Sequence, residues 1–304
     1  MFDILSVGHL AVDSIFLPGR TSPFVVLGGS GTYVSLAARR LDARVAVMSK
    51  VGADFADAYK WWLEQEGIDL THVRKDENGL TTRFELKYDE GLSDRVLRSE
   101  HRMPPIRIED ISPIPKTRVV HLGPIAGEIG YETAKMLRDF GEITSLDPQG
   151  LVRRFDDQGN VTLEPLMDKR ILELVDIFKS SLSEIRTVTG ISDLDSATKA
   201  IHDFGVKIVI VTLGKDGAAV SVEGSIHKVP ASKPVQFIDP TGAGDAFIGG
   251  FLAEYVRGED CSWCSCVGAA SASFVVEGIG PTVFGRKEEI YLRAHDMYEK
   301  EIKQ

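Results

Sequence analysis

The residues best suited to chemistry lie together in Asp239-Pro-Thr-Gly-Ala-Gly-Asp245-Ala-Phe247. Gly242 and Gly244 allow a sharp turn, and the amides that follow them are unbonded donors at the start of a helix expected over 246–255. Such donors bind anions, phosphate above all, because they coincide with the positive end of the helix dipole. Asp245 adds a carboxylate to this anion site, which suits a base that takes a proton from a hydroxyl beside a transferring phosphoryl group.

A simpler interpretation of the same residues exists. Asp245 would complement the dipole of its own helix, and the glycines would form a turn after a short apolar strand, Val235 to Ile238. Short glycine motifs also match by chance, so the rest of the sequence has to decide between the two interpretations.

Three further stretches carry residues suited to a ligand. Asp13 follows the first expected strand, where its carboxylate could accept hydrogen bonds from hydroxyls, and Gly28-Gly29 precede a helix expected over 32–41. Thr212-Leu-Gly-Lys-Asp-Gly217 follows the strongest strand, at the strand end where open α/β sheets bind ligands. Each stretch taken alone is equally typical of a turn or a cap, and a hairpin turn into 218–222 would account for Gly217.

Length and charge narrow the class of protein. The 304 residues are 43% hydrophobic and 26% charged, as in ordinary globular α/β proteins. A formal charge of -10 argues against a nucleic-acid or anionic-membrane partner, although backbone amides can still bind phosphate. No apolar run is long enough to span a bilayer, and the first residues lack the features of a secretory signal, so we expect a cytoplasmic protein.

The three cysteines lie close together, at Cys261, Cys264 and Cys266. A closed zinc site usually takes four ligands, and no histidine lies near them in sequence, so buried, reduced thiols are the better interpretation.

Short β-branched runs alternate with helical patterns, which predicts α/β architecture with a mostly parallel central sheet covered by helices. The clearest strands are expected over 4–7, 44–49, 119–122, 143–146 and 208–212. The helices are expected over 32–41, 55–65, 130–140, 194–204, 263–276 and 287–302. No linker divides the chain, so residues 1–304 are expected to form a single domain.

Two segments depart from this alternation. Residues 14–27 are extended and contain proline, and residues 80–102 have the pattern of a hairpin. We expect the two to pair as a small β lid, which would exclude water from a phosphate site. A purely decorative surface hairpin is the alternative.

Taken in order, Gly28-Gly29, Thr212 to Gly217 and Asp239 to Phe247 resemble the motifs of the ribokinase family of carbohydrate kinases, also called the PfkB family. The P-loop, the protein-kinase motifs and the Rossmann fingerprint are absent from the sequence. The resemblance covers essentially the whole chain. It implies a ribokinase-like three-layer sandwich with a small β lid.

The resemblance also implies an activity. Members transfer the terminal phosphoryl group of a nucleotide, ATP or ADP, to a substrate hydroxyl with Mg²⁺, and a monovalent cation and a homodimer formed through the lid are further expectations. By this resemblance Asp245 is the base. The implied anion hole consists of Gly242, Ala243 and Gly244. The implied substrate contacts are Asp13, Gly28 and Gly29. The implied nucleotide contacts are Thr212, Gly214 and Gly217.

Two positions depart from the family pattern. Tyr33 stands where the family usually has a substrate-binding Asn, so the usual ribose or fructose pose is in question. The family's N-x-x-E, which organises Mg²⁺ water and phosphates, is replaced by Ser181-Leu-Ser-Glu184. Glu184 keeps its place and would act on the metal through water. Ser181 is shorter than Asn, so its phosphate contact would run through water.

The stretch from Leu146 to Arg153 resembles the inositol kinase branch of the family, as does Phe84 to Tyr88. Gln149 and Arg153 would hydrogen-bond a polyol or an existing phosphate, whereas Arg154 fits a solvated loop equally well. We therefore expect a sugar or cyclic polyol as acceptor, with myo-inositol first. A nucleoside kinase, an ADP-dependent sugar kinase and a non-catalytic ligand-binding protein on the same fold are the alternatives.

Overall fold

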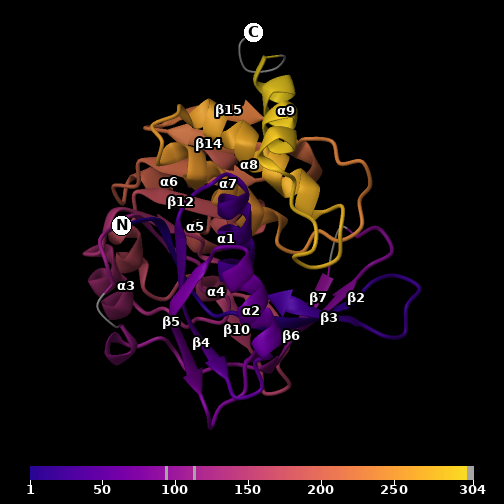
Figure 1. Cartoon of the computed structure of the whole chain (residues 1–304). Helices are drawn as coiled ribbons and strands as arrows, with labels where there is room; N and C mark the ends of the chain where they lie inside the picture. Colours follow the sequence, from indigo (N-terminus) through magenta and orange to yellow (C-terminus); the bar gives the residue numbers. More distant parts are fainter. Residues whose placement is uncertain (93–94, 112–113, 300–304) are drawn as a thin grey trace.

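The computed structural model describes residues 1–92, 95–111 and 114–299 (Figure 1). A large sheet lies at its centre, with strand order β15-β14-β13-β12-β9-β8-β1-β4-β5. Its strands are β1 Phe2–Val7, β4 Val45–Gly52, β5 Asp69–Asp76, β8 Thr117–Leu122, β9 Gly141–Leu146, β12 Ile177–Ser181, β13 Ile208–Thr212, β14 Ala218–Val222 and β15 Ser225–Val229. The strands from β13 to β5 run parallel, and β14 and β15 add an antiparallel edge.

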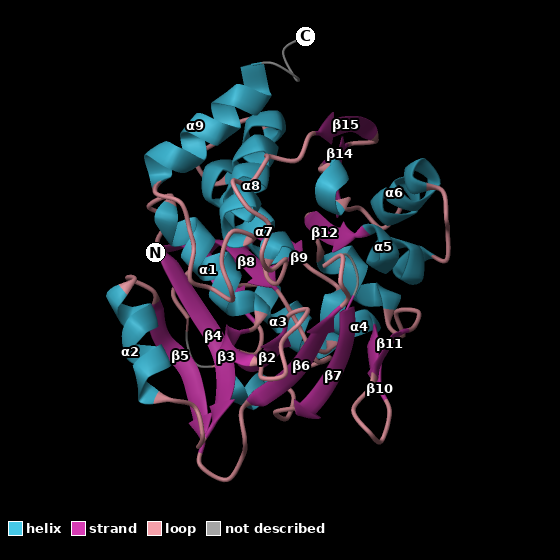
Figure 2. Ribbon diagram, turned by 90° about the vertical axis from the view of Figure 1, so that its right-hand side faces the viewer, coloured by secondary structure: helices cyan, strands magenta, loops and turns pink. Residues whose placement is uncertain are grey.

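Helices cover both faces of this sheet, as an apolar parallel sheet requires (Figure 2). One face carries α1 Ser30–Arg40, α7 Ala243–Tyr255, α8 Cys261–Val275 and α9 Lys287–Met297. The other carries α3 Tyr131–Arg138, α5 Leu182–Thr189 and α6 Leu194–His202. The helix α2 Asp57–Gln65 packs beside β5. The three-layer α/β expectation is therefore confirmed.

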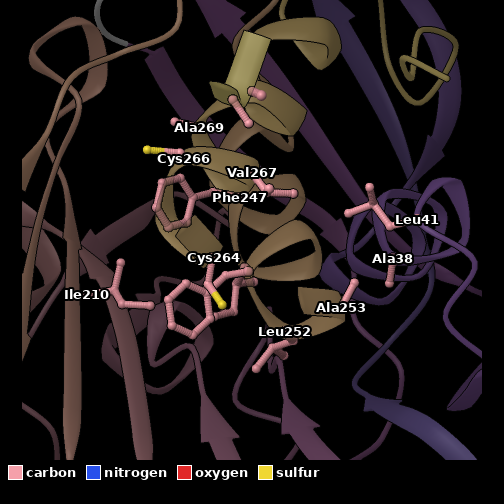
Figure 3. Close-up of a cluster of buried hydrophobic side chains, with 14 of the residues drawn as sticks. Ala38, Leu41, Ile210, Phe247, Leu252, Ala253, Cys264, Cys266, Val267 and Ala269 are labelled. Atoms are coloured by element: carbon pink, nitrogen blue, oxygen red, sulfur yellow. The ribbon is translucent and has the colours of Figure 1, made fainter. Parts of the chain in front are cut away.

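Helices α7 and α8 are apolar on nearly every side, because both are buried between the sheet and other helices. Figure 3 shows Phe247 of α7, Val267 of α8 and Ile210 of β13 in one cluster. Cys264 and Cys266 lie in the same cluster, where a thiol behaves as a small apolar group. Within the described ranges, no helix is long and apolar enough to cross a membrane.

A second, smaller sheet has the order β3-β2-β6-β7. Its strands are β2 Ala11–Phe16, β3 Phe24–Gly28, β6 Thr82–Tyr88 and β7 Arg95–His101. The segments 14–27 and 80–102 thus pair as expected, through parallel contact of β2 with β6. The first segment starts earlier than expected, so Asp13 lies within β2, opposite Phe84. Residues 93–94 of the expected hairpin and 300–302 of the expected last helix lie outside the described residues.

Short elements complete the chain. The helix α4 Gln149–Val152 leads directly into β10 Arg153–Phe155, which pairs with β11 Val161–Leu163. Short 3₁₀ helices lie at η1 Ile108–Asp110, η2 Lys169–Leu174 and η3 Gly214–Asp216.

The expected strand Val235 to Ile238 is wrong, because these residues form no strand. Val235 and Phe237 are 85% and 51% exposed. The amides of this segment bond to the end of α8 instead of a strand. Val235 N donates to Glu277 Oε1 at 2.8 Å, and Ile238 N donates to Val276 O at 2.8 Å.

Glu254 lies near the C-terminal end of α7 and anchors this helix to its neighbours. Its carboxylate is 2% exposed and accepts hydrogen bonds from Trp263 Nε1 of α8 at 3.0 Å and from Tyr291 OH of α9 at 2.9 Å; it also pairs with Arg257. Glu254→Ala removes the acceptor of two half-buried donors, Trp263 Nε1 and Tyr291 OH, and one partner of Arg257. We therefore expect the free energy of unfolding in urea to fall by about 2 kcal/mol or more.

The matched control is Glu64→Ala. Glu64 is exposed and lies 4.0 Å from Lys60, so its removal should change the free energy of unfolding by less than about 1 kcal/mol. Equal losses in the two variants would contradict the anchoring role of Glu254.

Candidate active site

One pocket lies between the first turns of α1 and α7 and the small sheet, with a volume of about 50 Å³. Seven residues expected at the substrate or the base line it: Asp13, Gly29, Tyr33, Gln149, Arg153, Gly242 and Asp245. Seven others complete the wall: Ser30, Phe84, Leu86, Arg95, Leu97, Ile125 and Thr241. Residues far apart in sequence therefore converge on one small, partly polar space.

Asp245 lies in the first turn of α7, and its Oδ1 is held by two donors. Ser30 Oγ donates to it at 2.7 Å and Gln149 Nε2 at 3.2 Å. In the part of the chain that the structure describes, Oδ2 has no hydrogen-bond partner. One carboxylate oxygen is thus fixed by the protein, and the other remains available to a ligand.

The amides around Asp245 differ in how they are used. Ala243 N donates to Pro240 O at 3.2 Å. Within the described residues, the amides of Gly242, Gly244 and Asp245 have no hydrogen-bond partner, as at other helix starts. Two of the three residues expected in the anion hole, Gly242 and Gly244, therefore offer an available donor, and Asp245 adds a third. Ala243 contributes backbone shape more than a donor.

The two glycines of this turn are required for different reasons. Gly242 has a left-handed backbone, with φ of 79°, and a Cβ there would lie 2.2 Å from Tyr33 Cδ1. Gly244 has an ordinary helical backbone, but a Cβ there would lie 2.7 Å from Lys179 Nζ. Gly242 is required by the left-handed turn, whereas Gly244 is required because Lys179 occupies the space of a side chain there.

Asp13 is buried over the paired glycines of the sequence. A Cβ on Gly28 would lie 2.0 Å from Asp13 Oδ2, so only glycine allows this approach. Burial raises the pKa of Asp13 to about 7, against the lowering effect of Arg95 and Arg153. At neutral pH a carboxyl group with this pKa is ionised in only a fraction of the protein molecules.

A chain of hydrogen bonds joins Arg153 to Asp245. Arg153 donates to Ile125 O at 2.9 Å and to Gln149 Oε1 at 2.8 Å, which turns the Gln149 amide nitrogen towards Asp245. Arg154, also in β10, donates instead to Leu151 O of α4 and to Pro165 O. Arg153 is thus part of the site, and Arg154 bonds to backbone oxygens outside it.

The small sheet makes direct contact with the Asp239 stretch. Tyr88 OH lies 2.8 Å from Thr241 Oγ1, and Arg95 donates to Tyr88 OH at 2.7 Å. Thr241 in turn donates to Asp239 Oδ1 at 2.6 Å. The hairpin of β6 and β7 is therefore hydrogen-bonded to the loop that begins α7.

Tyr33 is fully buried, with its ring against Gly242. Burial raises the pKa of its hydroxyl well above the ordinary value. Among the described residues this hydroxyl has no hydrogen-bond partner. A buried hydroxyl of this kind is costly to leave unbonded, which makes it a candidate ligand contact.

The residues expected at the nucleotide lie outside this pocket, at neighbouring strand ends. Ser181 and Thr212 are opposite each other where β12 and β13 end, and Gly214 follows in η3. Gly217 closes the hairpin into β14, where a Cβ would lie 2.0 Å from Val229 O. The hairpin interpretation of Gly217 is thus correct.

Ser181 and Glu184 form a capping box at the start of α5. Ser181 N donates to Glu184 Oε2 at 2.7 Å, and Glu184 N donates to Ser181 Oγ at 3.3 Å. Among the described residues there is no group of three His, Cys, Asp or Glu side chains that could hold a metal ion.

Several residues of the site were missed by sequence reasoning: Ser30, Tyr88, Arg95, Asp147, Lys179 and Thr241. One signal was present for Lys179, because a lysine interrupts the apolar run Ile177-Phe178 just before a strand end. Lys179 Nζ donates to Asp147 Oδ2 at 2.6 Å, and both side chains are buried.

Two known proteins of similar sequence are kinases by name. The chain is 29% identical over 294 residues to the cytidine kinase of Thermococcus kodakarensis, which covers 92% of this chain and 98% of that protein. It is 29% identical over 301 residues to the inositol 3-kinase of Oryza sativa, which covers 93% of this chain and 70% of that protein.

Solved structures share the fold. A pyrophosphate-dependent kinase in the ribokinase family, complexed with a pyrophosphate analogue and myo-inositol, matches with a TM-score of 0.81 at 24% identity, covering 95% of this chain and 99% of that one. The nucleoside kinase of Burkholderia thailandensis in complex with inosine matches with a TM-score of 0.77 at 21% identity, covering 97% and 98%. The ribokinase-like fold expectation is confirmed.

The family model described as pfkB family carbohydrate kinase matches residues 1–96 and 146–286. These ranges contain the paired glycines, the Thr212 turn and the Asp239 stretch, so the resemblance drawn from these motifs is confirmed. The chain belongs to the pfkB family of carbohydrate kinases.

Proposed function

We propose that the protein transfers the terminal phosphoryl group of a nucleotide, ATP first, to a hydroxyl of a sugar or cyclic polyol such as myo-inositol. The observation that carries this proposal is the Asp245 carboxylate. It lies beside three available amides at the start of α7, and its Oδ1 is fixed by Ser30 and Gln149. A base and an anion site are thereby adjacent, which is what phosphoryl transfer to a hydroxyl needs.

The chain's own residues would divide the chemistry as follows. Asp245 Oδ2 accepts the proton of the attacking hydroxyl as the acceptor oxygen bonds to phosphorus and the donor oxygen leaves. The amides of Gly242, Gly244 and Asp245 stabilise the charge on the transferring group. Asp13, Gln149 and Arg153 orient the other hydroxyls of the acceptor, and Gly28 and Gly29 let it approach the backbone.

Thr212, Gly214 and Gly217 would bind the donor nucleotide at the ends of β13 and β14. Mg²⁺ would neutralise charge on the donor phosphates, held by them and by water, with Glu184 and Ser181 in the outer layer of contacts. A monovalent cation stays a prediction, as do cytoplasmic localisation and a single domain over 1–304. A homodimer also stays a prediction. It would form by pairing of the small sheets of two subunits, and β3 is an edge strand of that sheet.

Pocket size supports a compact acceptor. The volume of about 50 Å³ is a third of the roughly 150 Å³ cavity that accommodates benzene, so even a single ring needs the pocket to widen about threefold. A base attached to a ribose would need a much larger displacement of the small sheet. The contact between Tyr88 and Thr241 opposes that displacement.

A nucleoside acceptor is the second candidate, and the sequence relatives favour it. The cytidine kinase relative covers nearly the whole chain, and a nucleoside kinase of Methanothermobacter thermautotrophicus is also 29% identical over 291 residues. The ring of Phe84 in the pocket wall could pack on a base. An ADP-dependent sugar kinase remains the alternative for the donor.

A coupled assay tests the activity. Acceptors should include myo-inositol, ribose, fructose, cytidine and inosine, each with ATP, ADP or pyrophosphate. We expect transfer from ATP to myo-inositol, and Asp245→Asn should lower kcat by two to four orders of magnitude with nucleotide affinity little changed. The exposed Asp57→Asn is the control. Full activity in Asp245→Asn would remove the base from the mechanism.

The pKa of Asp13 predicts a pH dependence of acceptor binding. Because the pKa is about 7 in place of 3.8, the carboxyl gains an accepting oxygen as the pH rises through 7. We expect kcat/KM for the acceptor to rise between about pH 6 and pH 8, with this step absent in Asp13→Asn. The free energy of unfolding should show the opposite trend, falling between about pH 4 and pH 7, because the folded state binds the extra proton. An unchanged kinetic step in the variant would refute the assignment.

Tyr33→Phe tests the buried hydroxyl without changing the ring. Because that hydroxyl has no partner among the described residues, its loss should leave the free energy of unfolding unchanged or raise it by about 1 kcal/mol. If the hydroxyl bonds the acceptor, KM for the acceptor should rise about tenfold. Tyr59→Phe on α2 is the control. An unchanged KM would show that Tyr33 only packs against Gly242.

A further inference from the structure

Lys179 is a buried cation in β12 that no step above uses. Its side chain is about 6% exposed, and its Nζ donates to Asp147 Oδ2 at 2.6 Å. Burial acts to lower the pKa of Lys179, but the carboxylates of Asp147, Asp245 and Glu184 outweigh that effect and raise it. The lysine is therefore charged, and it lies among three acidic groups of the site.

The missing side chain of Gly244 leaves room for Lys179 Nζ. A Cβ on Gly244 would lie 2.7 Å from Nζ, so the ammonium occupies the space that a side chain would fill in the first turn of α7. The available amides of Gly244 and Asp245 belong to the same turn. The positive charge thus lies next to the anion hole and not only between two strands.

The Lys179 ammonium has more N–H donors than the described residues provide acceptors for. An ammonium has three N–H donors, and within the described residues one of them is used, by Asp147. Leaving a buried charge with so few acceptors is costly, so additional oxygens are needed around Nζ. Donor phosphate oxygens bound at the adjacent amides would supply them.

Charge balance points the same way. Asp147, Asp245 and Glu184 are all close enough to affect Lys179, and a phosphoryl group brings further negative charge into their vicinity. Asp147 also accepts from Gln149 N at 3.1 Å, so the same carboxylate orients both Lys179 and the residue that holds Asp245. A cation in this place offsets repulsion that would otherwise oppose transfer.

We propose that Lys179 donates hydrogen bonds to the transferring phosphoryl group, held by Asp147 in the space that Gly244 leaves open. This inference rests on the proposed kinase function. Lys179 keeps its protons throughout: the bond from phosphorus to the donor oxygen breaks, the bond to the acceptor oxygen forms, and the hydroxyl proton goes to Asp245. The competing interpretation is a buried ion pair that only joins β9 to β12.

Lys179→Met tests the proposal by removing the charge and keeping the stem. We expect kcat to fall about 100-fold or more, as for other single donors to a transition state, with KM for the acceptor changed less than threefold. Lys179→Gln, which keeps a neutral donor, should lose less. Lys207→Met is the matched control, because Lys207 is exposed and pairs with Asp176 at 2.9 Å just before β13 and β12 begin, at the opposite end of these strands from Ser181 and Thr212.

Binding of a transition-state analogue separates the two interpretations. Calorimetry should compare Mg²⁺-ADP alone with Mg²⁺-ADP plus aluminium fluoride and the acceptor found in the assay. We expect Lys179→Met to weaken the aluminium fluoride complex about 100-fold and ADP alone less than threefold. Equal weakening of both, or of neither, would overturn the proposal and leave a structural ion pair.

Failure of this inference is distinguishable from failure of the proposed function. If the wild-type protein phosphorylates no acceptor in the panel, the kinase proposal fails. If the wild type is active and both Lys179→Met and Lys179→Gln keep kcat within threefold, Lys179 has no contact with the transferring group while the kinase function stands.

Discussion

The close approach of the first turn of α7 to side chains from two other elements, α1 and β12, is the constraint on which the site depends. Tyr33 of α1 fills the space at Gly242, and Lys179 of β12 fills the space at Gly244. Any Cβ at either position would displace these groups. The turn can therefore hold its amides and Asp245 in one place only because both glycines lack side chains.

Helix α7, which contains this turn, is held at both of its ends. At the far end of α7, Glu254 accepts hydrogen bonds from α8 and α9, which fixes the helix against its neighbours. At the near end, Asp239 accepts from Thr241 and from Gly280 N at 3.0 Å, which fixes the loop before the helix. A rigid helix start matters because preorganised donors stabilise developing charge without having to move.

The small sheet contributes chemistry as well as cover. It supplies Asp13 from β2 and the aromatic and aliphatic wall from β6 and β7, and Tyr88 bonds it to Thr241. Acceptor recognition and the start of α7 are thereby physically linked. The arrangement of the small sheet against that loop consequently sets how much room the acceptor has.

The alternation of strands and helices, the two segments of the small sheet and the Asp239 to Phe247 stretch could all be predicted from the sequence. They could be predicted because they are local patterns of apolar spacing and turn residues. Only the tertiary structure brought Lys179 and Asp147 together at the ends of β9 and β12, and Tyr88 against Thr241, 153 positions away. It also decided that Val235 to Ile238 is no strand, because its amides bond to the end of α8. Pairings between distant segments depend on sheet order and helix packing, which local sequence patterns do not encode.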